Sequence, residues 1–64
     1  MRRSDFTRDT VAVIKRALSL GYYQHIIAGY YQTNQGRISE IKNGVWGEDV
    51  SAGDYLPPDF PALA

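Results

Sequence analysis

The residues with the most specific chemistry lie in one polar segment, residues 34–44, which reads NQGRISEIKNG. An amide such as that of Gln35 can bond both N6 and N7 of adenine, and a carboxylate such as that of Glu40 can accept a hydrogen bond from N4 of cytosine. Ile38 and Ile41 are three positions apart, which is the spacing of one face of a helix. The segment therefore predicts a helix with an apolar inner face and a polar outer face able to bond to base edges.

The outer face follows from the 100° step between successive helical residues. With both isoleucines turned inward, the residues expected to face bases in the major groove of DNA are Gln35, Gly36, Ser39, Glu40 and Asn43. Ordinary surface roles stay open, with Gln35 as a solvated first-turn residue and Glu40 as the partner of a lysine or arginine. Gly36 costs a helix roughly 0.5–1 kcal/mol relative to alanine, so it either permits close approach to DNA or reflects weak constraint on the sequence.

Enzymatic chemistry has little support in this sequence. His25 is the single histidine, and cysteine is absent. Neither a metal cluster nor a nucleophile–base pair can be assembled from such a set. We expect a protein that is not an enzyme and that binds no cofactor or metal ion, with His25 on the surface or beside a phosphate.

Length and composition favour one small protein domain of the cytoplasm. A chain of 64 residues buries only about 60% of the surface that its unfolded form exposes. No disulfide can form, no apolar run approaches the roughly 18 residues of a membrane span, and no apolar segment of a signal peptide follows Met-Arg-Arg. We therefore expect a cytoplasmic protein, associated with the nucleoid when it is bound to DNA.

The zero net charge conceals a split between the two ends of the chain. Residues 1–44 carry all seven basic groups and three acidic ones, whereas residues 45–64 carry four acidic groups and no basic one. A basic head of this kind suggests a polyanionic partner, although small proteins also acquire lopsided charge by chance. Lys15 and Arg16 are expected on a solvated helix face.

Three helices are needed to position the polar segment. The first begins near Thr7, with Asp5 or Thr7 as its cap, turns Val11, Ile14 and Leu18 inward, and stops at Gly21. The second runs from Tyr22 or Tyr23 to Tyr31, with Ile27, Ala28 and Tyr31 on its inner face. The third follows the N-cap Asn34, spans Gln35 to Asn43 and is closed by Gly44.

Beyond Gly44 the sequence is rich in proline and acidic residues, which excludes a continuous helix. Val45, Trp46 and Val50 are expected to fold back onto the helices, with LPPDFP as an extended strap or a partly disordered tail. We accordingly divide the chain into a basic N-terminal arm (1–6), a helical domain (7–50) and an acidic, proline-rich tail (51–64).

The tyrosines are expected mainly in the core, because a small domain needs large rings for its buried area. Tyr31 and one of Tyr22 and Tyr23 should lie inside. Tyr30 is the best candidate for an exposed ring, which would leave it able to stack on single-stranded nucleic acid.

Two short helices joined by a tight turn, the second polar outside and apolar inside, constitute a helix-turn-helix unit. Residues 24–44, QHIIAGYYQTNQGRISEIKNG, resemble the helix-turn-helix of the phage repressor and Cro family, which is lambda repressor-like and of the XRE type. The following IKNGVWGEDV is similar to the I-x-x-G-x-x-W-x-x-V ending of small helix-turn-helix modules. The similarity extends from about Thr10 to Val50.

The resemblance implies a compact all-α fold of three helices, with room for one further short helix or turn, that binds double-stranded DNA as a transcription regulator. Candidates for contacts to the DNA backbone are Gln24, Thr33, Asn34, Arg37, Lys42, Arg2 and Arg3. One departure from the family is Gln32 and Thr33, which stand where glycine and a valine-like residue are usual. The turn must therefore strain a non-glycine residue or take another conformation.

Binding by a single such unit would be weak, because few phosphate contacts release few counterions. We therefore expect a homodimer or another transcription regulator as partner, contacted through Val50, Tyr55, Leu56, Phe60 and Leu63. An alternative is an adaptor or antiactivator that uses the same scaffold to bind another regulator. A third is an acidic tail that covers the basic head, so that deletion after Val50 would tighten binding to DNA.

Overall fold

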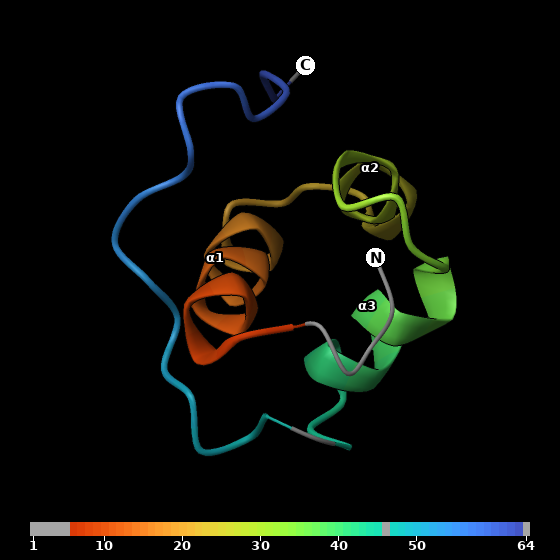
Figure 1. Cartoon of the computed structure of the whole chain (residues 1–64), viewed down its shortest axis with the longest axis vertical. Helices are drawn as coiled ribbons and strands as arrows, with labels where there is room; N and C mark the ends of the chain where they lie inside the picture. The colour runs from red at the N-terminus through yellow and green to blue at the C-terminus, as the bar shows by residue number, and fades with distance from the viewer. Residues whose placement is uncertain (1–5, 46, 64) are drawn as a thin grey trace.

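The computed structural model describes residues 6–45 and 47–63, and in these residues it contains three helices and no strand. The helices are α1 (Arg8–Ser19), α2 (Gln24–Tyr30) and α3 (Gln35–Lys42), and α3 packs against both others (Figure 1). The all-α class expected from the sequence is confirmed. Each helix begins and ends within two residues of its predicted bounds.

Side-chain caps begin two of the three helices, at the predicted residues. The hydroxyl of Thr7 accepts a hydrogen bond from the backbone N–H of Thr10 at 3.1 Å, and the side-chain oxygen of Asn34 accepts one from that of Gly36 at 2.6 Å. α2 follows Tyr23 without a side-chain cap. Asp5, the other proposed cap of α1, lies outside the described residues.

All three helices end in the same hydrogen-bonded turn. In each, a backbone N–H beyond the helix donates to a carbonyl five residues earlier, with Tyr22 bonding Ala17 at 3.1 Å, Thr33 bonding Ala28 at 2.9 Å and Val45 bonding Glu40 at 2.9 Å. Such a turn needs one left-handed residue. Gly21 and Gly44 supply it for α1 and α3 at φ +96° and +74°, and Gln32 supplies it for α2 at φ +54°.

Gln32 resolves the question that the sequence left open about the turn between α2 and α3. The turn keeps the conformation that glycine normally allows, with a non-glycine residue in it, and the N–H of Gln32 donates to the carbonyl of Gly29 at 3.2 Å. A left-handed backbone costs an ordinary residue roughly 1–2 kcal/mol. The close packing of α2 against α3 sustains this strain.

The core lies where the three helices face one another. Ile14, Ile27 and Ile38 are fully buried, and Ile41 is only 2% exposed. The other members of the core cluster are Val11, Ala17, Tyr22, Ala28 and Val50. Ile38 and Ile41 therefore face inward as predicted, which leaves the opposite side of α3 as its outer side.

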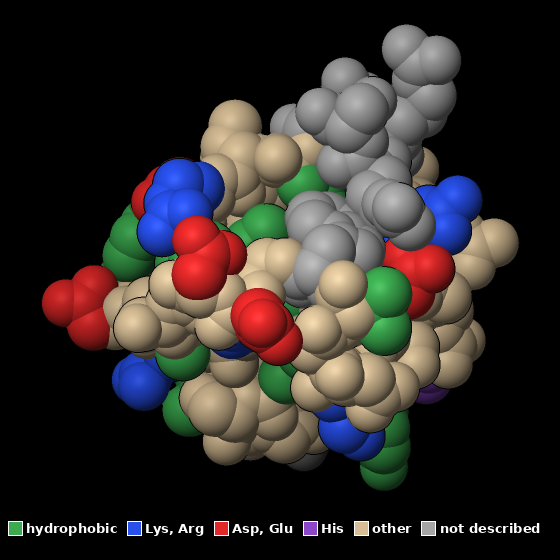
Figure 2. Space-filling model, turned by 90° about the horizontal axis from the view of Figure 1, so that it is seen from below, with side chains coloured by type: hydrophobic (Ala, Val, Ile, Leu, Met, Phe, Trp, Pro, Cys, Tyr) green, Lys and Arg blue, Asp and Glu red, His purple; other side chains and the backbone are tan. Residues whose placement is uncertain are grey.

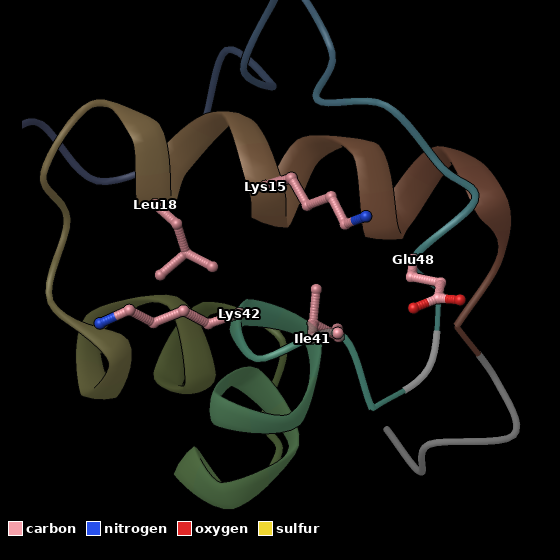
Figure 3. A pocket seen from close by; sticks show the side chains of 6 residues that line it. Lys15, Leu18, Ile41, Lys42 and Glu48 are labelled. Carbon is pink, nitrogen blue, oxygen red and sulfur yellow. The ribbon is translucent and has the colours of Figure 1, made fainter.

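Residues 47–63, here called the strap, cross α1 on the side away from α3 and end beside α2 (Figures 1 and 3). Midway, the N–H of Gly53 donates to the carbonyl of Ala12 at 2.9 Å. At the far end the phenol of Tyr22 donates to the carbonyl of Pro61 at 2.7 Å, and the ring of Phe60 lies edge-on to that of Tyr22. The strap is thus bonded and packed to the helices along its length.

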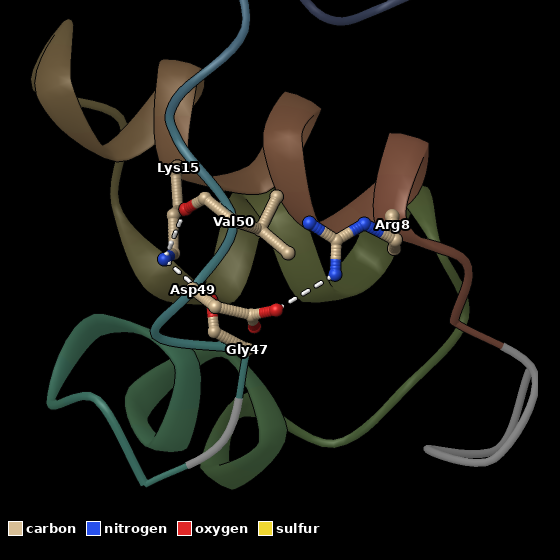
Figure 4. Close-up of polar contacts among 5 residues, drawn as sticks. All are labelled: Arg8, Lys15, Gly47, Asp49 and Val50. Carbon is tan, nitrogen blue, oxygen red and sulfur yellow. Dashed lines mark hydrogen bonds and ion pairs between the residues drawn. The ribbon is translucent and has the colours of Figure 1, made fainter.

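Lys15 fixes the near end of the strap and is not the solvated residue that we expected. Its ammonium donates to the carbonyls of Gly47 at 2.6 Å and Val50 at 2.5 Å (Figure 4). Beside it, Arg8 and Asp49 form an ion pair at 2.8 Å, and the hydrogen bond from Arg8 lowers the pKa of Asp49. The expectation was wrong because the turn at residues 47–50 directs two carbonyls at α1 while Val50 is buried next to them.

Two further expectations need correction. Val45 is 67% exposed and does not fold back, because its N–H closes the terminal turn of α3 and its side chain points outward. Val50 is buried as predicted, and Trp46 lies outside the described residues. Of the four tyrosines considered for the core, the exposed one is Tyr23, at 73%, in place of Tyr30.

Tyr30 is only partly exposed because the strap returns to cover it. Its ring centroid lies 4.6 Å from that of Phe60, and its phenol donates to the carboxylate of Asp59 at 2.7 Å, which raises the pKa of Tyr30. Tyr31 is partly buried beside it, and this burial, with the adjacent Tyr30 phenol, raises the pKa of Tyr31 to about 12. Tyr22 and Tyr31 face inward as predicted.

Candidate functional site

The outer side of α3 carries the five residues proposed to face bases. Gln35, Gly36 and Asn43 are exposed, and Ser39 and Glu40 are partly exposed. α3 supplies all of them except Asn43, which is the residue that ends it. These five residues, here called the α3 face, therefore form one continuous polar side along the helix.

Contacts within the α3 face limit how its side chains are presented. The amide of Asn43 donates to the hydroxyl of Ser39 at 3.3 Å, and Arg37 lies 3.6 Å from the carboxylate of Glu40. The surface ion pair that we considered for Glu40 is thus formed. Because such solvent-exposed pairs contribute only about 0.2–1 kcal/mol, Arg37 can leave it at little cost.

The structure gives a local reason for glycine at position 36, which the sequence did not reveal. A Cβ at this position would lie 3.0 Å from the side-chain oxygen of Asn34, which is the atom that caps α3. No other atom lies near this Cβ apart from a second atom of the same Asn34 side chain at 3.9 Å. Glycine therefore favours a short cap and also leaves the first turn of the α3 face open.

Apart from Arg37, which is paired with Glu40, the described candidates for contacts to the DNA backbone divide into two groups. Gln24 and Lys42 lie close together around one hollow. Thr33 is partly buried in the turn between α2 and α3, and the exposed Asn34 already uses its side chain as a cap. Arg2 and Arg3 lie outside the described residues.

The hollow that contains Lys42 and Gln24, here called the polar hollow, has a volume of about 440 Å³. It lies where the connection between α1 and α2 passes α3. Its lining consists of Leu18, Gly21, Tyr22, Tyr23, Gln24, His25, Gln35 and Lys42. Gln35 of the α3 face thus shares one recess with two candidates for the DNA backbone, a grouping that sequence spacing alone does not reveal.

A second hollow of about 270 Å³ lies between α1 and α3 (Figure 3). Lys15, Leu18, Ile41, Lys42, Gly44 and Glu48 line it. The Lys15 ammonium is held by the strap, and the ammonium of Lys42 points away from Glu48, toward the side of Leu18 (Figure 3). The positive charge of Lys42 therefore lies at the polar hollow and not beside Glu48.

Three of the five residues proposed to contact a partner are already used inside the molecule. Val50 is buried, and Leu56 and Phe60 pack against the core, so this part of our prediction is wrong. Tyr55 and Leu63 are exposed by 49% and 52%. The fold uses the apolar residues of the strap because α2 and α3 leave the far side of α1 uncovered.

Folding also mixes the charges that are separated along the sequence. The Arg8–Asp49 pair joins the basic head to the acidic strap, and acidic and basic described side chains alternate on the face in Figure 2. The polar hollow differs from this face, because its described lining contains Lys42 and His25 but no carboxylate. It is the more favourable place for an anion.

Comparison of the chain with protein-family models, with curated proteins and with solved structures found no match. Within the described residues no helix is long and apolar enough to cross a membrane, and no three His, Cys, Asp or Glu side chains are grouped to hold a metal ion. The function must therefore be inferred from the positions and chemistry of the chain's own side chains.

Proposed function

We propose that this chain is a helix-turn-helix protein that binds double-stranded DNA sequence-specifically as a transcription regulator, with α3 in the major groove. The observation that supports this most is the orientation of α3. Ile38 and Ile41 are buried while Gln35, Gly36 and Asn43 are exposed. A helix so placed can approach base edges without disturbing the core.

The strap is compatible with this role. It crosses α1 on the side away from α3 (Figure 1), and Gln35, Gly36 and Asn43 of the α3 face are exposed. The alternative in which the acidic tail covers the basic head and shields α3 is therefore not favoured. Since Leu56 and Phe60 of the strap pack on the core, deletion after Val50 would remove part of the fold.

The proposal predicts that duplex binding depends on salt and on Arg37. Each lost phosphate contact reduces the slope of log affinity against log salt by about one, so Arg37→Ala should flatten the slope by about that amount. Arg16→Ala is the matched control, because Arg16 is in the last turn of α1 and lines none of the hollows described above. Fluorescence anisotropy with a labelled duplex measures both variants.

Equal slopes for Arg37→Ala and the wild type would contradict the proposed placement of α3. Absence of binding to any duplex, random or selected, would favour the second candidate function, an adaptor that binds another regulator. The mixed charges of Figure 2 and the exposed rings of Tyr23 and Tyr55 favour that alternative.

A further inference from the structure

We infer that the polar hollow is a phosphate site and that protonation of His25 strengthens its binding. The inference rests on the proposed function, in which the phosphate belongs to the DNA backbone beside the groove that α3 occupies. It adds a pH-sensitive contact that base reading by α3 does not require.

The lining of the hollow suits an anion. Lys42 supplies a positive charge, and Gln24 and Gln35 supply amide N–H groups from two different helices. Among the described residues that line it there is no Asp or Glu, whereas the neighbouring hollow contains Glu48. A phosphate oxygen in this recess would meet amide hydrogen-bond donors and the ammonium of Lys42.

His25 is positioned to add a second charge. Its ring lies parallel to that of Tyr23, with centroids 5.7 Å apart and an angle of 10°, and both side chains are exposed. The other titratable groups that line the hollow are Lys42 and the phenols of Tyr22 and Tyr23, and the phenol of Tyr22 already donates to the carbonyl of Pro61. The hollow therefore holds no group that would neutralise a protonated imidazole.

Histidine is the side chain that ordinarily changes its charge between pH 5 and 8. Protonated His25 and Lys42 repel each other across an empty hollow, and a phosphate placed between them removes this repulsion. Proton and phosphate therefore favour each other's binding, so affinity for a phosphate-bearing ligand should rise as the pH falls.

The test measures duplex affinity from pH 5.5 to 8.5 at constant ionic strength for the wild type, His25→Gln and Arg16→Gln. The wild type and Arg16→Gln should each bind about two- to fivefold more tightly at pH 5.5 than at pH 8.5, as expected for one added, exposed ion pair. His25→Gln should lose this gain. Circular dichroism at each pH verifies that the variants stay folded.

A second arm uses inorganic phosphate and follows the backbone amide resonances of Gln24, His25 and Lys42 by NMR. Duplex binding by the wild type that is salt-dependent but independent of pH, or a pH gain that persists in His25→Gln, would overturn the inference and leave the proposed function intact. Absence of duplex binding would overturn both. Inorganic phosphate that shifts these resonances while no duplex binds would reveal a small-anion site and overturn the assignment to DNA.

Discussion

Gln32 holds a left-handed backbone at the end of α2, where the bond from Thr33 to Ala28 fixes the turn. Glycine occupies the equivalent position after α1 and after α3. The turn sets how α3 is presented, so the strain at this residue is part of what positions the α3 face.

Replacing Gln32 by glycine should relieve this strain. Because Gln32→Gly and Gln32→Ala lose the same side-chain contacts beyond Cβ, their difference isolates the backbone, and the glycine variant should be the more stable by about 1 kcal/mol. Chemical denaturation of the two variants measures the difference in the free energy of unfolding. Equal stabilities would mean that the turn is not strained at Gln32.

Tyr31 makes the free energy of unfolding depend on pH in the alkaline range. Its pKa is raised to about 12 by burial first and by the Tyr30 phenol second, so the folded protein favours the neutral ring more than the unfolded chain does. The stabilisation is complete below about pH 10, the ordinary value for tyrosine, and is lost as the pH rises through 12. Denaturation between pH 9 and 12 should show this fall, and Tyr31→Phe should reduce it. A fall of equal size in Tyr31→Phe would exclude Tyr31 as its source.

Among the structural elements, the strap is the one that covers the part of the core that the three short helices leave open. Val50, Leu56 and Phe60 supply the apolar cover, and Lys15 ties the carbonyls of Gly47 and Val50 to α1. These bonds join segments more than thirty residues apart in the sequence. The strap thus belongs to the folded unit formed with α1 and α2.

Lys15→Met should loosen the strap while keeping a side chain of similar length. The variant loses two charge-assisted hydrogen bonds in a partly buried place, which should cost about 2 kcal/mol of unfolding free energy. Arg16→Met removes one charge from the neighbouring position and should cost well under 1 kcal/mol. Denaturant midpoints and amide exchange in residues 47–53 provide the measurement, and equal losses in the two variants would contradict the role assigned to Lys15.

The helices were predictable because their signals are local. Thr7 and Asn34 cap by contacts within three residues, Gly21 and Gly44 stop helices, and Ile38 and Ile41 repeat at helical spacing. The role of Lys15, the cover over Tyr30 and the grouping of Gln24 with Lys42 depend on contacts between distant segments. Sequence periodicity carries no information about such contacts. The expectations for Lys15 and Tyr30 were therefore wrong, and the grouping of Gln24 with Lys42 was not predicted.

For the molecule as a whole, folding gives different parts of the surface different charge. The strap pairs with the basic head at Arg8, which mixes the charges on that side, whereas the described lining of the polar hollow contains Lys42 and no carboxylate. If the basic head attracts a polyanion, as we propose, the polar hollow is the most favourable place for it. If DNA is the partner, as we propose, binding by one copy should be weak, because few phosphate contacts release few counterions.

The most direct test of the central claim, that the exposed side of α3 reads base edges, is selection of bound sites from a random duplex library. The wild type should enrich a defined motif, and Gln35→Ala should relax preference at one or two adjacent base pairs while preserving it elsewhere. An identical motif for both proteins, or no enrichment by the wild type, would contradict it.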